Sequence, residues 1–416
     1  MRQLPSVGVL LVIFFVVGGI VGCDRGPDSL TTPVEQPAGA TQIQELDPIP
    51  YGLKPNEDEW VVLLDPTIDI EDLADDAGAS VVGAAGYSGV NLALLAAPGA
   101  VPDLNQPGVV AYVQNTGVNL STEGASLVIG FIGGNFTETN VRAQNALACL
   151  ELPVLHTHAK GDGMKIGVVD TGARLDHVAF AGRLEILEGH RLKSGELLGN
   201  GLDDDGDGDV DEGLGHGTFV AGMVALVAPG ATILPVKVLD DDGYGSMLGV
   251  VEGILVCRER GCDVINLSLV LSAYSSEFEK LLAQLSQEGI AITAAAGNDG
   301  ISNPFYPATS EYTVGVTAVT GDDVMPTYAA GGSDIWFAAP GHRVVSAGVW
   351  SPDAMAVGAG TSMATPVVSA AVVLVREAQA CGAAEAIGHL GATCAPTTPL
   401  HAIGRGRIAP VAACTD

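Results

Sequence analysis

Three residues far apart in the sequence have the types and surroundings from which a nucleophilic catalytic site could be built. Asp170 ends the apolar stretch KIGVVD, His216 lies between glycines in GHGTFVAGMVALV, and Ser362 follows a glycine-rich turn in GAGTSMATPVVSAAVVLV. A serine hydroxyl becomes a strong nucleophile when a histidine accepts its proton and a carboxylate orients that histidine. The three residue types together would therefore perform acyl transfer.

Taken one at a time, each residue also has a plain structural explanation. Ser is a favoured helix N-cap and Pro366 is tolerated in a first turn, so Ser362 suits a cap. Asp170 suits a hydrogen-bonded structural carboxylate, and His216 suits a capping or surface residue. A helix N-terminus also offers free N–H groups and a positive field, which help an oxyanion form. The combination of motifs, and no single motif, favours catalysis.

The segments around these residues predict how the chain would bring them together. From about residue 141, strand-like apolar segments alternate with helix-like segments, which predicts an α/β fold: a parallel sheet with helices on both faces. In such folds reactive groups gather at the carboxyl ends of the strands. Strands are expected at 165–170, 232–239, 262–270, 290–296, 312–319 and 335–341, and helices at 216–227, 245–261, 275–289 and from 361.

The order Asp, His, Ser and the residues around each resemble the subtilisin-like serine proteases over about 141–410. The motifs are VVDTG, GHGTFVAGMVA and GTSMATPVVSAAVVL. The resemblance implies that Ser362 is the nucleophile, His216 the general base and then acid, and Asp170 the orienting carboxylate. The segment AAAGNDG matches the oxyanion-hole segment, which implies Asn298 as a donor. A serine endopeptidase that forms an acyl-enzyme with protein or peptide substrates is therefore expected.

The sequence departs from the family pattern at two places. Phe219 stands where the family has a second histidine, and since that position is not the base, we expect activity to survive. Val270 and Leu271 stand where the family has two glycines, at the wall where the substrate backbone docks. Branched side chains there are expected to alter the groove and hence substrate preference.

An acidic insert, NGLDDDGDGDVDEG at 200–213, separates the aspartate and histidine motifs. Oxygen ligands at alternate positions, with glycine in the turn, suit Ca²⁺, and carboxylates this close repel one another without a cation. Similar loops occur at this place in some proteins of the family. We predict a structural calcium site, with a solvated acidic loop as the alternative. The alternating carboxylates belong to Asp203, Asp205, Asp207, Asp209 and Asp211.

The N-terminal residues are typical of a targeting segment. Residues 1–22 combine Arg2 with the apolar run VGVLLVIFFVVGGIVG, which is short for a membrane span, and they end before Cys23. This resembles a bacterial lipoprotein signal, which implies cleavage before Cys23 and a membrane anchor on the lipidated cysteine. An uncleaved anchor and an ordinary secretory signal are the alternatives, and each of these predicts that the protein is exported.

Between the signal and the catalytic motifs the sequence predicts three further parts. Residues 23–56 are a Pro- and Thr-rich tether, 57–115 a small α+β unit, and 116–140 a second linker before a peptidase domain at 141–416. The small unit has the expected order strand, helix, strand, strand, strand. Its position resembles that of the family's propeptides, which implies an inhibitory segment cut off between 115 and 150. The alternative is a permanent domain.

Six cysteines remain besides Cys23. In an oxidising compartment an even set predicts up to three disulfides, with buried free thiols as the alternative. Their spacing, without a Cys-x-x-Cys pair and histidines, argues against zinc. The six are Cys149, Cys257, Cys262, Cys381, Cys394 and Cys414.

The composition narrows the partners and leaves one competing function. The 49 Asp and Glu against 18 Lys and Arg give a net charge of −31, which argues against nucleic acid or an anionic membrane surface as a partner. An excess of carboxylate side chains suits the binding of hard cations, and it is also expected of a protein from a salty habitat. The expected partners are protein substrates, the chain's own propeptide and a membrane through Cys23. A catalytically inactive fold acting as a surface binding protein is the alternative.

Overall fold

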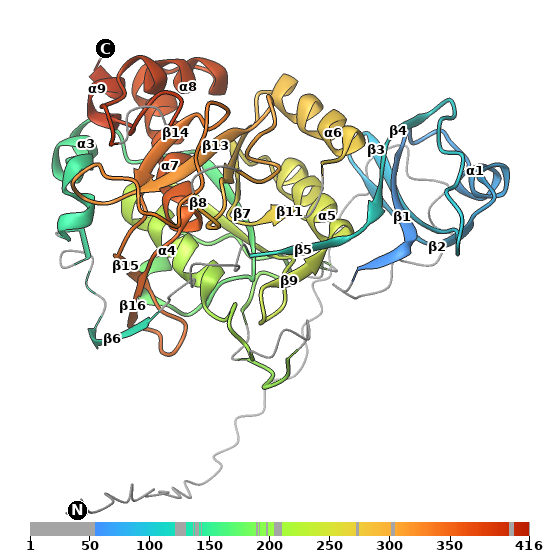
Figure 1. The fold of residues 1–416 in the computed structure, drawn as a ribbon, viewed down its shortest axis with the longest axis horizontal. Coiled ribbons are helices and arrows are strands. Elements are labelled where there is room, and N and C mark those ends of the chain that lie inside the picture. The colour runs from blue at the N-terminus through green and yellow to red at the C-terminus, as the bar shows by residue number, and fades with distance from the viewer. Residues whose placement is uncertain are drawn as a thin grey trace, which may run out of the picture. The chain divides into compact units, whose positions relative to one another are not determined.

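A six-stranded parallel sheet lies at the centre of the larger part of the structure (Figure 1). The structure is a computed structural model that describes residues 55–120, 130–135, 137, 141–142, 144–188, 190, 192–196, 199–203, 210–271, 274–300, 304–398 and 403–415. All neighbouring strands are parallel, which confirms the predicted fold class. In spatial order the strands are β14 (Phe337–Pro340), β13 (Val314–Val319), β12 (Ala291–Ala295), β10 (Val264–Leu267), β7 (Lys165–Asp170) and β8 (Thr232–Lys237).

Helices cover both faces of this sheet because successive residues of its strands are buried on opposite faces. Val168 joins the hydrophobic cluster formed with α4 and α7, whereas Val169 joins the cluster formed with α5 and α6. The apolar pattern is therefore continuous along each strand. The first face carries α4 (His216–Val227) and α7 (Thr361–Gln379), and α3 (Leu152–His158), α8 (Ala383–Ala392) and α9 (Pro410–Thr415) pack in the same cluster. The second face carries α5 (Met247–Glu259) and α6 (Ser276–Gln287).

The order of the strands reverses beside β7. After β7 the chain adds β8 on one side and then returns to place β10 on the other side. Ligand sites in open α/β sheets form at such a reversal, beyond the carboxyl ends of the strands. Asp170 ends β7 and Ser268 directly follows β10, so both residues lie at this edge.

The N-terminal part of the described chain is a four-stranded antiparallel sheet with one helix. Asp69 caps the helix by accepting hydrogen bonds from the N–H groups of Glu71 and Asp72, and Gly78 ends it in the left-handed conformation. The order of elements is the predicted strand, helix, strand, strand, strand. They are β1 (Asn56–Leu64), α1 (Ile70–Ala77), β2 (Ser80–Tyr87), β3 (Val90–Ala96) and β4 (Val109–Asn115), and the sheet order is β2-β3-β1-β4.

This N-terminal module packs on α5 and α6. Its apolar residues share a hydrophobic cluster with both helices. Polar contacts add to the interface: the Tyr87 hydroxyl donates to Glu252 Oε1 over 2.9 Å, and Arg258 Nη1 donates to the Ser88 carbonyl over 2.7 Å. The Leu248 N–H, at the start of α5, donates to the side chain of Asn115. The module is therefore joined to the helices by both apolar and polar contacts.

The described chain also forms two small antiparallel sheets. One has the order β11-β5-β9, and the other β15-β16-β6. Strands β5 and β6 lie within 116–140, which the composition predicted as a linker. Local composition could not reveal them, because their partners are more than a hundred residues away in the sequence. The strands are β5 (Gly117–Asn119), β6 (Gly130–Asn135), β9 (Tyr244–Ser246), β11 (Val270–Leu271), β15 (Val344–Ala347) and β16 (Ala354–Gly358), and two 3₁₀ helices occupy Asn145–Leu150 and Val178–Phe180.

The cysteines after residue 55 are free thiols in this structure, rather than the predicted disulfides. They act as small apolar side chains in the hydrophobic clusters. Burial raises the pKa of the Cys394 thiol to about 11, so this thiol is protonated at neutral pH. The predicted signal 1–22, Cys23 and all but the last residues of the tether 23–56 lie outside the described residues.

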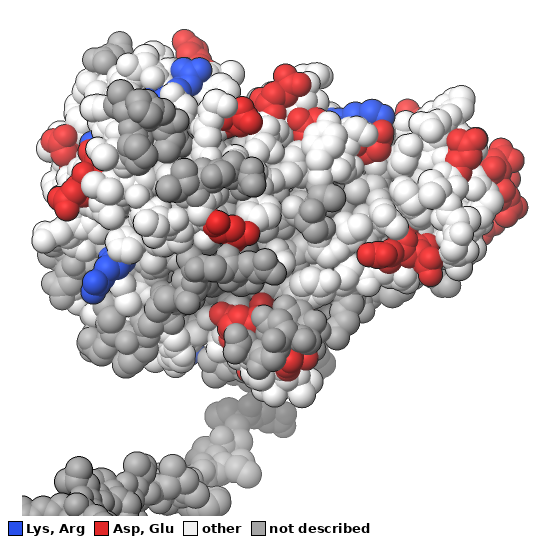
Figure 2. All heavy atoms as spheres, viewed as in Figure 1, with Lys and Arg blue, Asp and Glu red and all other residues white. Residues whose placement is uncertain are grey.

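The charged surface is mostly acidic. In the view of Figure 2, acidic side chains are spread over both the N-terminal module and the larger part, and basic side chains are sparse. Within the described ranges, no single helix is long and apolar enough to cross a membrane. Helices α7 and α8 meet the length and composition test only as a pair bent by 102°.

Candidate active site

Asp170 and His216 form a buried hydrogen-bonded pair. Asp170 ends β7 and His216 begins α4, and His216 Nδ1 lies 2.6 Å from Asp170 Oδ1. Both side chains are fully buried. The same carboxylate oxygen accepts the Thr171 N–H over 2.7 Å. Because Nδ1 faces the carboxylate, the other ring nitrogen, Nε2, is left to exchange protons, and it has no hydrogen-bond partner among the described residues.

Glycines on each side of His216 allow this close approach. Gly215 has φ +88°, which side-chain-bearing residues rarely adopt. A Cβ at Gly217 would lie only 2.0 Å from the Gly172 carbonyl oxygen, in the loop that follows Asp170. The glycines of the motif GHG are therefore needed for packing. They let the start of α4 approach the loop after Asp170 closely enough for His216 to contact Asp170.

Ser362 lies at the mouth of a buried helix, as predicted. It is the second residue of α7 and is 2% exposed. Its hydroxyl donates to the Ser268 carbonyl over 3.1 Å, and the Ser268 hydroxyl donates to the Ser362 carbonyl over 2.9 Å. The structure therefore places the hydroxyl against Ser268 and not against His216. A rotation about χ1 moves a serine hydroxyl between such positions, and catalytic hydrogen bonds commonly tighten only when substrate binds.

Asn298 is anchored by the residue that precedes Ser362. It follows β12, is 1% exposed, and its Oδ1 accepts the Thr361 N–H over 2.9 Å and the Thr361 hydroxyl over 3.3 Å. The Thr361 hydroxyl oxygen in turn accepts the Gly297 N–H. Because both bonds engage Oδ1, the orientation of the amide is fixed and its NH₂ group points away from Thr361. An amide held in this way is suited to donate to a developing negative charge.

Comparisons with known proteins show the family to which the chain belongs. The model of the subtilase family matches residues 161–406. Thermitase from Thermoactinomyces vulgaris is 33% identical over 230 residues, covering 53% of this chain and 77% of thermitase. The chain belongs to the subtilase family. It is a serine-type endopeptidase, and the family assignment predicted from its motifs is confirmed.

Other relatives and a solved structure are consistent with this subtilase assignment. Subtilisin BL from Lederbergia lenta is 31% identical over 238 residues, which cover 55% of this chain and 82% of subtilisin BL. The crystal structure of fervidolysin from Fervidobacterium pennivorans, a keratinolytic enzyme related to subtilisin, has a TM-score of 0.68 and 17% identity. It covers 90% of this chain, and this chain spans 65% of fervidolysin. At 17% identity, the similarity to fervidolysin shows only that the two chains share a fold.

The two departures from the family pattern have clear places in the structure of this subtilase. Phe219 is fully buried among core residues, and its ring fills the space beside Gly358. Val270 and Leu271 form β11 and are 4% and 2% exposed. They pair with an extended strand of the chain itself, so the side chains do not prevent a backbone from docking there.

That extended strand is β5, which lies between β11 and β9 in a three-stranded sheet. Val118 pairs with Leu271 on one side and with Gly245 on the other, both antiparallel. The Leu120 N–H continues the pairing by donating to the Gly243 carbonyl over 3.0 Å. Val118 and Leu120 are each 1% exposed. Strand β5 is therefore the central strand of a three-stranded antiparallel sheet, with alternate side chains buried.

The acidic insert of this subtilase is only partly described. Asp205, Asp207 and Asp209 lie outside the described residues. The Asp211 carboxylate accepts N–H groups of Asn200 and Gly201, each over 2.9 Å, so it closes the base of the insert. In the portions of the chain that are described, Asp203 included, no group of three or more metal-binding side chains comes together. The calcium site therefore stays a prediction.

Sequence reasoning missed several residues that position the predicted catalytic groups. Thr361 orients Asn298, Ser268 contacts Ser362, and Glu196 joins the surroundings of Asp170 and His216. Thr361 lies inside the motif GTSMATPVVSAAVVL, so its role could have been suspected, and Ser268 lies two residues before Val270, where the sequence departs from the family pattern. Glu196 lies in an unremarkable loop segment, KSGEL, and nothing in the local sequence marks it.

Proposed function

We propose that this subtilase is an exported endopeptidase that uses Ser362 as nucleophile, His216 as general base and acid, Asp170 as orienting carboxylate and Asn298 as oxyanion donor. The observation that carries the proposal is the buried 2.6 Å contact between His216 and Asp170 at the strand reversal of a subtilase fold. Ser362 lies at the same edge through its bonds with Ser268.

The proposed reaction follows from these positions. The Ser362 hydroxyl oxygen attacks the peptide carbonyl carbon as its proton passes to His216 Nε2. Asp170 holds Nδ1–H and stabilises the imidazolium, while the Asn298 NH₂ donates to the carbonyl oxygen as it becomes negative. His216 then protonates the leaving amine, which leaves an acyl-enzyme. A water molecule releases the acid product by the same steps in reverse.

Digestion of a broad protein substrate tests this proposal. The full chain from residue 24 is incubated with denatured casein beside a Ser362→Ala variant, and both are followed on a gel. The wild type is expected to shorten the substrate and itself, whereas the variant leaves both intact. A folded wild type that cleaves neither would favour the inactive binding protein.

We propose further that the N-terminal module, 57–115, is an inhibitory propeptide whose trailing strand β5 blocks the groove. Antiparallel pairing of Asn119 with Val270 directs the chain after β5 toward Ser268, the residue that contacts Ser362. A segment bound like this is presented in the manner of a substrate. Burial of Val118 and Leu120 supports a preference for substrates with apolar side chains two residues apart before the cleaved bond.

Sequencing the N-terminus of the mature enzyme tests where self-cleavage takes place. We expect the new N-terminus to lie within residues 121–125, because β5 runs antiparallel to β11 in the direction of Ser268, which contacts the proposed nucleophile. Cleavage there would leave a lipidated Cys23 on the propeptide side and release the protease from the membrane. A mature N-terminus before residue 117, or active protein found only at full length in membranes, would contradict the proposal.

The acidic insert is proposed to hold a structural calcium ion. Asp203, Asp205, Asp207, Asp209 and Asp211 would supply oxygen ligands, and the ion would offset their mutual repulsion. In the Ser362→Ala background, EDTA is expected to lower the Tm by about 5 °C, since a ligand at a hundred times its Kd adds about 2.7 kcal/mol. An Asp207→Asn, Asp209→Asn double variant should not respond to EDTA. An equal Tm with and without chelator in the parent would refute the calcium site.

A further inference from the structure

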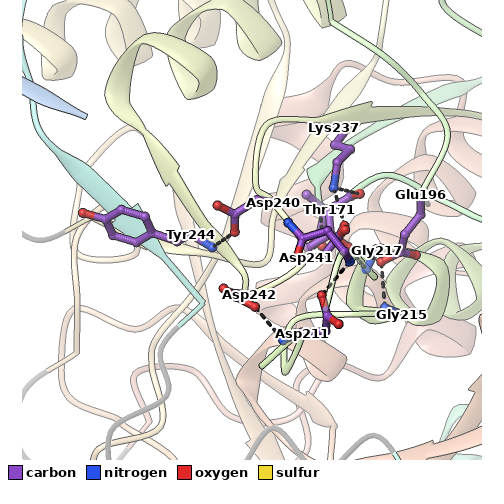
Figure 3. A network of polar contacts seen from close by, with 12 residues as sticks. Thr171, Glu196, Asp211, Gly215, Gly217, Lys237, Asp240, Asp241, Asp242 and Tyr244 are labelled. Atoms are coloured by element: carbon purple, nitrogen blue, oxygen red, sulfur yellow. Dashed lines mark hydrogen bonds and ion pairs between the residues drawn. The ribbon is translucent and has the colours of Figure 1, made fainter. Parts of the chain in front are cut away.

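Glu196 is a buried carboxylate whose acceptor positions are filled by hydrogen bonds. The Thr171 hydroxyl and the Gly215 N–H donate to Oε1 over 2.6 and 2.7 Å. The Thr218 N–H, over 3.2 Å, and the Thr218 hydroxyl donate to Oε2. Two bonds to each oxygen satisfy an ionised carboxylate completely. Figure 3 shows Glu196 directed toward Gly215 and the Thr171 region.

These bonds cap the helix that carries His216. A helix leaves its first N–H groups without intrahelical acceptors, and an N-cap side chain normally supplies one. Here the N-cap is Gly215, which has no side chain to do so. The Gly217 N–H donates to the Thr171 hydroxyl oxygen over 2.9 Å, and the Thr218 N–H donates to Glu196. Glu196 thus caps α4 from a separate segment of the chain.

The same carboxylate is tied to the loop that follows Asp170. Thr171 is the residue next to Asp170, and its hydroxyl bonds Glu196. The Glu196 N–H donates to the Ala173 carbonyl over 2.9 Å, so the backbone is attached as well. One side chain therefore connects the segment ending in Asp170 with the helix beginning at His216. The positions of those two elements set the 2.6 Å contact between the catalytic pair.

The charge of Glu196 also bears on His216. The α4 dipole places partial positive charge at the first turn, where His216 lies, and the Glu196 carboxylate brings a negative charge to the same turn. Two cations lie nearby: Lys237 Nζ pairs with Asp241 over 3.0 Å and its charge also lowers the pKa of Glu196, whereas the Arg174 guanidinium pairs with Asp176. Lys237 Nζ also donates to the Thr171 carbonyl over 3.2 Å. No ion pair to Glu196 is found in the described part of the chain, and the nearby Asp170 adds a second negative group.

Burial raises the pKa of the Glu196 carboxyl to about 7, although the bonds from Thr171, Thr218 and Gly215 act to lower it. Above that pH the carboxylate is ionised at a cost in stability. This cost is typical of a residue kept for function, because a purely structural residue would be selected to stabilise the fold.

We propose that Glu196 is a positioning residue for proteolysis: it caps the helix of His216, joins that helix to the Asp170 loop and supports the protonated state of His216. The inference rests on the proposed roles of Asp170 and His216. In this proposal, a glutamate outside the sequence motifs keeps the side chains of Asp170 and His216 in contact with each other.

Steady-state kinetics with Glu196→Gln, on the processed enzyme, tests the inference. Glutamine has one oxygen and an NH₂ group that would face hydrogen-bond donors, so the cap is lost at similar volume. We expect kcat to fall about 10²-fold, as for a displaced catalytic group, while KM stays within about twofold. The acid limb of kcat/KM should move down, since loss of the negative charge that Glu196 carries above about pH 7 disfavours the imidazolium.

Asp263→Asn is the matched control. Asp263 precedes β10 at the opposite end of the sheet and bonds the Lys165 N–H and Arg376, so its loss removes comparable interactions far from His216. This variant should lower the Tm without moving the acid limb. If Glu196→Gln behaves in the same way, with kcat and acid limb unchanged, Glu196 is merely structural and the inference is overturned.

Thr218→Val covers the case in which Glu196→Gln does not fold. It keeps the carboxylate but removes the hydroxyl donor, so Glu196 takes up a proton at higher pH. The acid limb is then expected to move down, in the same direction as in Glu196→Gln, because the neutral carboxyl no longer favours the imidazolium. An unmoved acid limb and an unchanged kcat in this variant would also overturn the inference.

A measurement independent of activity separates this inference from the proposed function. In ¹³C-histidine-labelled Ser362→Ala protein, the titration midpoint of His216 is followed by NMR with and without Glu196→Gln. A lower midpoint in the Glu196→Gln protein supports the inference even if no peptide hydrolysis is detected in the wild type. Coincident titrations contradict it, whereas an inert wild type counts against the proposed triad alone.

Discussion

Ser362→Ala should lower kcat for peptide hydrolysis by about 10⁶-fold, a loss of the size known for removing the nucleophile of subtilisin. The hydroxyl is the only group at this position that can form the acyl bond, and its loss also makes His216 useless as a base. Once the segment up to β5 has been removed in trans, KM should stay within a few-fold, because the substitution changes no backbone atom of β9 or β11. Active-enzyme assays with a chromogenic peptide measure both constants.

Self-processing should disappear with the same substitution. The full-length chain is expected to persist during storage, since the bond after β5 is presented to a residue that no longer reacts. Ser369→Ala is the control: Ser369 lies on the same helix, is fully buried and bonds Thr293 and Asn266, yet is remote from the proposed reaction. Similar losses of kcat in both variants, or processing of Ser362→Ala at the wild-type rate, would exclude Ser362 as nucleophile.

The elements that carry the site could be predicted from sequence because each is defined by local pattern. Strand β7 is an unbroken apolar run that ends on Asp170, and α4 is apolar all round because it is buried on all sides. Glycines around His216 and before Ser362 mark close backbone approaches and a helix start. Burial requires an apolar residue at each buried position, and close backbone approach requires glycine, so both can be recognised in the sequence itself.

The parts that escaped prediction depend on partners distant in sequence. The run 262–270 was expected as one strand, but the sheet strand ends at Leu267 and β11 begins at Val270. The chain leaves the sheet between them because Ser268 bonds Ser362 instead of a neighbouring strand. Strand β5 likewise exists only through its pairing with β9 and β11. No property of a single segment predicts such pairings.

Glu196 illustrates the same limit for the site. A glutamate in a polar loop is ordinarily solvated, and only the fold shows that four donors from two segments surround it. The cap of α4 cannot be local, because Gly215 must have a positive φ where a capping side chain would stand. The need for an acceptor at this helix start was therefore predictable, but the residue that meets it was not.

Asp170→Asn should lower kcat by about 10⁴-fold. Asp170 Oδ1 accepts both the His216 Nδ1–H and the Thr171 N–H. If the asparagine oxygen keeps this place, the tautomer of His216 is preserved but the charge that stabilises the imidazolium is lost. If the NH₂ group takes the place, Nδ1 must accept, the proton moves to Nε2 and His216 can no longer act as a base. Either orientation removes several kcal/mol of transition-state stabilisation.

The thermal stability of the Asp170→Asn variant distinguishes an orienting role of Asp170 from a structural one. Asp170 Oδ2 is buried without a hydrogen-bond partner among the residues that the structure describes, so the ionised carboxylate is costly to bury. The substituted asparagine carries no charge, and in the Ser362→Ala background the Tm of the Asp170→Asn variant is expected to equal or exceed that of the parent. Thermal unfolding beside the kinetics measures both effects. A tenfold or smaller loss of kcat, or a large fall in Tm, would mean that Asp170 holds the fold rather than orients His216.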